Sequence, residues 1–308
     1  MATITAALVK ELRDMTSAGM MDCKKALNET DGDLQAAADW LRTKGIAKAT
    51  KKAGRIASEG LIGLAVDGTK AALIELNSET DFVARNEEFQ SAVREIAALS
   101  IGVNGDIDVL NTTPTASGKT VTEFITGLIA TIGENMSLRR TAMLSVYDGV
   151  VAGYMHNATT EGLGKIGVLV ALESSGDKAV LESLGKKIAM HVAATAPLSL
   201  TVEDMDPAAV ERERTLLSDE ARVSGKPEAI IEKMVEGRIT KFFKESVLMN
   251  QIFVMDGERS IAKVIEDEAK TLGCDVKMTG FLRMALGEGI EKKEENFAAE
   301  VAATLGNG

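Results

Sequence analysis

The clearest pattern along the chain is an apolar run that ends abruptly in polar residues and gives way to helical spacing. Residues 71–76 form a short, mostly apolar run that is typical of a buried strand. The polar residues at 77–81 predict a break in regular structure. Apolar residues then recur at the spacing of an amphipathic helix, namely Phe89, Val93 and Ile96. Asp81 and Phe82 are therefore expected side by side where a strand turns into a helix.

Asp81 and Phe82 allow two interpretations. In the first, the acidic and aromatic side chains form an exposed tip that inserts into a partner molecule. In the second, Asp81 caps the following helix and Phe82 joins the core, which is the commoner arrangement for these residue types. The local sequence favours the second interpretation and leaves the first open.

The strand pattern before this break occurs twice in the chain. Runs at 61–66 and 70–76 flank a hairpin signal, Asp67-Gly68, and similar runs at 150–154 and 168–174 precede a second amphipathic helix. Four residues match at one constant offset: Leu73, Leu76, Ser78 and Asp81 with Leu169, Leu172, Ser174 and Asp177. Such a repeat predicts two related α+β subdomains. Only the first copy has an aromatic residue after its aspartate.

The amino-terminal part predicts three short helices between residues 4 and 45, with Asp31 able to cap the third and Gly45 closing it. Met20 and Met21 fit either the small core of this module or a soft contact surface. The basic segment that follows has no interleaved aromatic residues and favours a solvated linker helix over an RNA contact. Its cations are Lys44, Lys48, Lys51, Lys52 and Arg55.

The second half of the chain predicts mainly helices. One helix ends at Ile132-Gly133, and two charged helices on either side of a turn at 224–227 predict an antiparallel hairpin. The hairpin is expected to expose one apolar stripe that packs on the core or on another subunit: Ile231, Val235, Ile239 and Phe242. An extended segment at 253–255, a helix at 261–272, a strand at 278–286 and a terminal helix follow; the apolar residues of that last helix are Phe297, Val301 and Leu305.

Together these patterns predict an α+β protein with small antiparallel sheets. The expected parts are a helical module with its linker at 1–55, core subdomains at 56–145 and at 146–204 with 250–285, a helical hairpin at 205–249, and a carboxy-terminal helical module at 286–308.

Composition narrows the classes of partner. The chain has 308 residues, a formal net charge of -11 and 4% aromatic residues, which argues against broad binding to nucleic acid or anionic membranes. Two cysteines and two histidines are too scattered for a zinc site. The amino terminus lacks the apolar core of a signal peptide, and no apolar run approaches the roughly 20 residues that span a bilayer. We expect a cytoplasmic location and a protein partner or small ligand.

Two motifs that suggest nucleotide binding fail on their context. Residues 162–167 match G-x-G-x-x-G, but they open a strand, whereas a dinucleotide fingerprint follows a strand and opens a helix. Gly118-Lys119-Thr120 lacks the earlier glycine of a phosphate-binding loop. No nucleophile, base and orienting residue can be assembled, because His191 lies on the apolar face of a helix and is expected in the core. An enzyme is therefore not expected, and no cofactor or metal is predicted.

Six stretches, in order, resemble the elongation factor Ts family from about residue 3 to about residue 303. They are TSAGMMDCKKAL from Thr16, TDFVARN from Thr80, IGENMSLRR from Ile132, HVAA from His191, SGKPEAIIEKMVEGR from Ser224 and GEGIEK from Gly287. The resemblance implies a nucleotide exchange factor for the GTPase elongation factor Tu. It also implies an amino-terminal module like a ubiquitin-associated domain and a hairpin used in dimerisation, giving a complex of two copies of each protein.

The resemblance also assigns residues to contacts with the partner. A first group would dislodge the partner's Mg²⁺, with Asp81 and Phe82 intruding near its phosphate site: Thr80, Asp81, Phe82, Val83, Ile132 and Gly133. A second group would contact other surfaces, three residues against a helix of the nucleotide domain and one against the carboxy-terminal barrel: Arg13, Met20, Met21 and His156. The alternative to exchange is a non-enzymatic adaptor or chaperone that uses the helical module and the hairpin.

Overall fold

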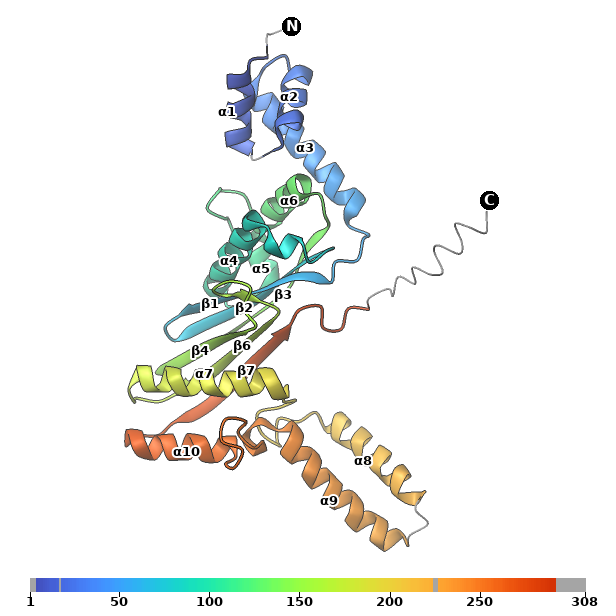
Figure 1. Cartoon of the computed structure of the whole chain (residues 1–308), viewed down its shortest axis with the longest axis vertical. Helices are drawn as coiled ribbons and strands as arrows, with labels where there is room; N and C mark the ends of the chain where they lie inside the picture. Colours follow the sequence, from blue (N-terminus) through green and yellow to red (C-terminus); the bar gives the residue numbers. More distant parts are fainter. Residues whose placement is uncertain (1–3, 17, 224–226, 292–308) are drawn as a thin grey trace.

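The computed structural model describes residues 4–16, 18–223 and 227–291. It is an elongated α+β molecule with a helical module at one end and a helical hairpin at the other (Figure 1). Between them lie two antiparallel sheets with helices on their outer sides. The predicted terminal helix with Phe297, Val301 and Leu305 lies outside the described residues, as does most of the predicted turn at 224–227.

The amino-terminal module consists of α1 (Ala6–Thr16), α2 (Met20–Glu29) and α3 (Leu34–Lys52) around a small core that includes Leu12 and Leu27. The predicted cap and end of the third helix are wrong. Asp33 caps α3 by accepting a hydrogen bond from the Ala36 amide at 2.8 Å. The helix continues through Gly45, which is buried and approaches Ala130 of α6 (Val121–Ile132), so packing overrides the usual role of glycine as a terminator. The basic segment is thus helical through Lys52, as predicted, while Arg55 lies in the turn that follows.

The first sheet has the strand order β3-β2-β1-β5. Its members are β1 (Glu59–Asp67), β2 (Lys70–Ser78), β3 (Met136–Ser145) and β5 (Leu163–Gly164). The helix α4 (Glu87–Gly102) packs on the sheet with α6, while α5 (Ile107–Thr112) joins them. The predicted apolar face of α4 is confirmed, because Phe89, Val93 and Ile96 are all fully buried.

The second sheet has the order β4-β6-β7. Its members are β4 (Gly149–His156), β6 (Ile166–Glu173) and β7 (Lys277–Ala285). Two helices, α7 (Lys178–Thr195) and α10 (Ile261–Leu272), cover its outer face. The inner faces of the two sheets share a core that includes Ile62, Leu73 and Leu169. The fold is therefore layered as helices, sheet, sheet and helices (Figure 1).

The internal repeat is confirmed in backbone detail. Each copy has a register shift at the equivalent place in its middle strand, between Glu75 and Leu76 in the first and between Ala171 and Leu172 in the second. Each copy also has a glycine with positive φ beside that strand, at 119° in Gly60 and 143° in Gly149. A Cβ atom at these glycines would lie 2.2 Å and 1.9 Å from a backbone carbonyl oxygen, so both positions require glycine.

The helical hairpin consists of α8 (Pro207–Arg222) and α9 (Glu228–Ser246). The expectation of an exposed apolar stripe is wrong for Ile231, Val235 and Ile239, which are buried against α8 within the hairpin itself. Side chains of α8 cover the stripe, namely Ala221 and the partly buried Leu217. The expected extended segment at 253–255 is also wrong, since Val254 and Met255 lie in a turn that follows the short 3₁₀ helix η2 (Leu248–Asn250).

Candidate interaction site

The acidic and aromatic pair lies in an exposed turn directly after β2. Asp81 is exposed, and Phe82 is 74% accessible to solvent. The interpretation in which Asp81 caps the helix and Phe82 joins the core is therefore wrong. The N-cap of α4 is Asn86, whose side-chain oxygen accepts a hydrogen bond from the Phe89 amide at 3.0 Å. An exposed phenylalanine at a turn is unusual, because burying it would stabilise the fold.

The turn is held from beneath by the residues that follow it. Val83 is only 4% exposed and begins the short 3₁₀ helix η1 (Val83–Arg85), which packs into the core under α4. The side-chain amide of Gln90 donates a hydrogen bond to the Ala84 carbonyl at 2.8 Å. Val83 thus acts as an anchor in the free chain, while Phe82 is directed outward.

The end of α6 lies beside this turn, as the resemblance implied. Gly133 takes the left-handed conformation, with φ of 91°, and ends the helix after Ile132. The next residue, Glu134, accepts hydrogen bonds from the amide and the hydroxyl of Thr80 at 2.9 and 2.6 Å. The structure therefore brings together 80–83 and 132–133. Sequence reasoning missed Glu134, because its partner lies far away in the chain.

Arg13, Met20 and Met21 belong to a second surface, on α1 and α2 of the amino-terminal module. All three are exposed, and the two methionines are 61% and 77% accessible. The core-packing interpretation of Met20 and Met21 is therefore wrong for this chain. Flexible, polarizable methionine side chains are suited to a contact surface for another protein.

His156 lies on a third surface, at the end of the edge strand β4. It is half-buried, and its Nδ1 is 3.2 Å from the hydroxyl oxygen of Tyr154. The sequence-predicted residues thus form one cluster around the tip and two separate surfaces.

The residues that suggested enzymatic chemistry have structural roles. His191 is fully buried, and its Nε2 is 2.8 Å from Oε1 of Gln251, while Nδ1 accepts a hydrogen bond from the Val254 amide at 3.3 Å. Burial lowers the pKa of His191, so this side chain stays neutral in the core. Thr120, from the apparent phosphate-loop motif, forms a capping box with Glu123 at the start of α6.

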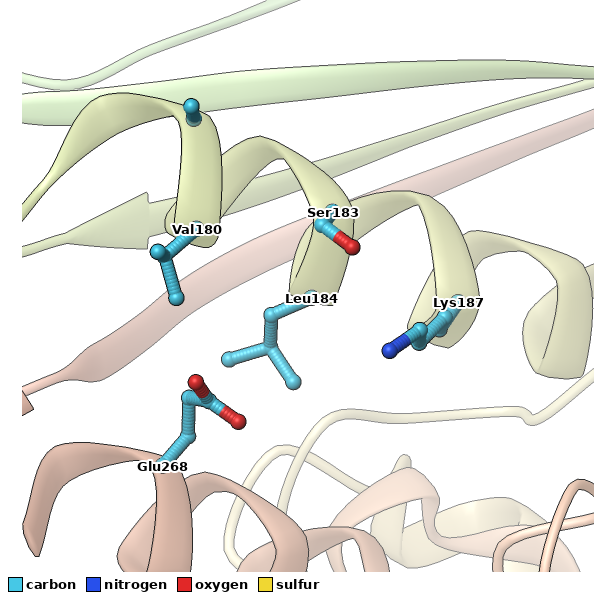
Figure 2. A pocket seen from close by; sticks show the side chains of 6 residues that line it. Val180, Ser183, Leu184, Lys187 and Glu268 are labelled. Carbon is cyan, nitrogen blue, oxygen red and sulfur yellow. The ribbon is translucent and has the colours of Figure 1, made fainter. Parts of the chain in front are cut away.

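Two of the clefts in the described part of the chain lie beside its helices. One of 290 Å³ lies between α7 and α10, where Lys187 and Glu268 approach it from the two helices (Figure 2). A larger groove of 400 Å³, which includes Trp40 and Lys44, separates the amino-terminal module from α6. Within residues 4–16, 18–223 and 227–291, no three or more histidine, cysteine, aspartate or glutamate side chains are placed to hold a metal ion. None of the helices in these ranges is both long and apolar enough to cross a bilayer.

These features define an α+β protein that is built on a duplicated β-β-α unit and has an exposed acidic-aromatic tip. A family profile described as "Elongation factor TS" matches residues 79–288. Proteins named Elongation factor Ts are similar over 99% of the chain: 60% identical in Rhodospirillum rubrum, across 99% of that protein, and 57% in Rhodospirillum centenum, across all of it. The Caulobacter vibrioides protein is 56% identical, across 99% of its length. The chain belongs to the elongation factor Ts family and is a translation elongation factor.

Proposed function

We propose that this chain is a guanine nucleotide exchange factor for elongation factor Tu. It would bind the GDP form of the GTPase, insert Asp81 and Phe82 near the Mg²⁺ and phosphate site, and promote release of GDP so that GTP can bind. The observation that carries the proposal is the exposed phenylalanine on an anchored turn. No covalent chemistry is required.

The energies indicate that the tip does not act alone. A nucleotide held at nanomolar affinity is bound with about 12 kcal/mol. Burying one phenylalanine contributes only about 1.5–3 kcal/mol. The remaining free energy must come from a broad interface, for which Arg13, Met20, Met21 and His156 are the proposed contacts. These contacts would hold the tip against the nucleotide site while Phe82 displaces partner side chains.

Asp81 would supply the electrostatic part of the mechanism. Its exposed carboxylate, brought near the bound Mg²⁺, would compete with the ligands or waters that hold the ion. Linkage then requires that bound nucleotide weaken the factor's affinity by the same ratio as the factor weakens nucleotide affinity. The complex with all three components is therefore short-lived, and incoming GTP expels the factor.

We also propose the functional division of the chain that the sequence suggested, with the module at 1–55 and the subdomains at 56–145 and 146–204 with 250–285 holding the partner. The hairpin at 205–249 would form a homodimer and so a complex of two copies of each protein. Since its central stripe is covered, the dimer contact would use the exposed side chains Leu216, Val223 and Ile230. Replacing Leu216 by Glu would then give monomers by light scattering.

Stopped-flow release of fluorescent GDP from elongation factor Tu tests the exchange function. The wild-type chain is expected to accelerate release, and Phe82→Ala is expected to lose most of that acceleration while keeping most of its affinity. Leu198→Ala serves as a control, because Leu198 is also an exposed apolar residue but lies after α7. An unaltered release rate in Phe82→Ala would count against the insertion of Phe82, whereas a wild-type chain that fails to accelerate release would favour the adaptor or chaperone alternative.

A further inference from the structure

Two glutamates tie the tip to the end of α6 by a reciprocal arrangement. Glu134 accepts the hydrogen bonds of the Thr80 amide and hydroxyl, at 2.9 and 2.6 Å. Glu79 accepts a hydrogen bond from the Asn135 amide at 2.6 Å. Each carboxylate therefore binds the backbone amide of the residue that follows the other glutamate. We call these four residues, Glu79, Thr80, Glu134 and Asn135, the glutamate latch.

A third segment joins the latch from the amino-terminal side. Arg55 forms an ion pair with Glu79 at 3.3 Å, and the carbonyl of Arg55 accepts a hydrogen bond from the side-chain amide of Asn135 at 2.8 Å. Lys52, the last residue of α3, donates to the Gly133 carbonyl. The cation of Arg55 lies beside the Glu79 carboxylate and offsets part of the negative charge of the latch. The latch is thus supported by the segment that leads from the helical module.

The second copy of the repeat shows what the latch replaces. There, the Asp177 carboxylate caps α7 by accepting hydrogen bonds from the amides of Ala179 and Val180 at 2.8 and 3.1 Å. The helix cap there comes from a residue of the turn itself. In the first copy Asn86 caps the helix instead, which leaves the turn without that local support. The carboxylate of Glu134, which follows α6, holds the turn of the first copy instead.

We propose that Glu134 is a positioning residue for nucleotide exchange, acting through the glutamate latch to hold Phe82 outward before the partner arrives. The inference rests on the proposed exchange function. A turn that is already ordered does not lose conformational entropy when it inserts, so more of the binding energy is available to displace the partner's side chains. The Glu134 carboxylate suits this role because its charge-assisted hydrogen bonds to the amide and the hydroxyl of Thr80 fix both the position and the direction of the turn.

The test compares Glu134→Ala with Glu134→Gln in the full chain. The glutamine can accept from the Thr80 amide and donate to its hydroxyl, so it preserves the geometry, whereas alanine loses both bonds. We expect the GDP release rate at saturating factor to fall about tenfold in Glu134→Ala and to be largely restored in Glu134→Gln. Glu88→Ala, at an exposed position in the first turn of α4, removes the same charge and should leave the rate unchanged.

Two further measurements separate positioning from general loss of structure. In Glu134→Ala without partner, the Thr80 amide resonance should shift upfield and exchange faster with solvent, while amides of β2 stay protected. The double variant Glu134→Ala/Phe82→Ala should release GDP no more slowly than Phe82→Ala, because the glutamate acts through the phenylalanine.

The outcomes distinguish this inference from the function on which it rests. If the wild-type chain fails to accelerate GDP release, the exchange function is overturned and the positioning role with it. If the wild type is active and Glu134→Ala matches it, or if the two substitutions have additive effects, only the positioning role is overturned.

Discussion

The two copies of the repeat have the same scaffold and different ends. In the second copy the chain passes directly from Asp177 into α7, and the aspartate is used as a helix cap. In the first copy residues 82–86 separate Asp81 from α4, Asn86 is the cap, and the aspartate is left exposed beside Phe82. Stability alone does not require this arrangement, since in the second copy the equivalent residues begin the helix directly. The difference separates a structural aspartate from one that is available for a partner.

A second difference between the copies lies in the middle strands. Glu75 of β2 is fully buried, whereas the equivalent residue of β6 is Ala171. The Glu75 carboxylate accepts hydrogen bonds from four groups: Arg139, Arg140, Asn77 and the Gly287 amide. It therefore links the first sheet to the segment that follows β7, and the second copy has no counterpart of this charge.

The largest expected effect comes from removing that buried carboxylate. Glu75→Ala would leave two arginines and the Gly287 amide without their shared acceptor. Because both arginines are partly exposed and can reach water, we expect a loss of about 3 kcal/mol in the free energy of unfolding, at the lower end for a broken buried pair. Urea unfolding measures it. Glu173→Ala, at a half-buried position in β6, should cost much less, and equal losses would contradict the special role of Glu75.

The Glu75 carboxylate should also make the free energy of unfolding depend on pH. Burial by itself raises the pKa of Glu75, but the hydrogen bonds from Gly287, Asn77 and Arg140 outweigh it and hold the pKa below its ordinary value of 4.5. Its contribution is therefore present above pH 4.5 and is lost as the pH falls toward the lower folded-state pKa. The free energies of unfolding of the wild type and Glu75→Gln, measured between pH 6 and pH 3, should converge as the pH falls. A difference that stays constant with pH would refute this linkage.

His191 gives the second copy its own dependence on pH. Burial depresses its pKa below the ordinary value of 6.5, so protonation favours the unfolded chain. The free energy of unfolding is expected to be unaffected by His191 above pH 6.5 and to decline as the pH falls below that value. In His191→Gln this decline should be absent between pH 7.5 and 5.5. A decline of the same size in both proteins would assign the effect to another group.

The smallest expected stability effects come from the two aspartates themselves. Asp177→Ala removes a helix cap and should cost about 1 kcal/mol of unfolding free energy. Asp81→Ala removes an exposed carboxylate and should change stability by less than about 0.5 kcal/mol. Exchange activity should show the reverse order, with Asp81→Ala impaired and Asp177→Ala near wild type. Thermal unfolding and GDP release should be measured on both variants. If the variant that loses more stability also loses more exchange activity, the proposed difference in role between the two aspartates is wrong.

Regular periodicity was sufficient to predict most of the secondary structure. The helix Ile261–Leu272, the hairpin of β1 and β2, and the repeat follow from spacing that each segment contains within itself. The sequence could not decide the direction of Phe82, because an aspartate before an aromatic residue fits a cap as well as a tip. That choice depends on Asn86 taking the capping role and on Val83 filling the core.

Several of the remaining errors have a common physical cause, because they depend on contacts between separate elements. Gly45 stays within α3 because Ala130 lies against it. The stripe containing Val235 is covered because α8 packs on it. The buried charge of Glu75 and the glutamate latch likewise join residues that are far apart in the chain. The likeness of the amino-terminal module to a ubiquitin-associated domain stays a prediction.

The central claim is that the ring of Phe82, exposed in the free protein, becomes buried in elongation factor Tu. Fluorine NMR of a chain carrying 4-fluorophenylalanine at position 82 measures this directly through the shift difference between H₂O and D₂O. The account predicts a solvent-induced shift in the free chain that disappears when elongation factor Tu with GDP is added. A shift that persists in the complex, while GDP release is still accelerated, would contradict it.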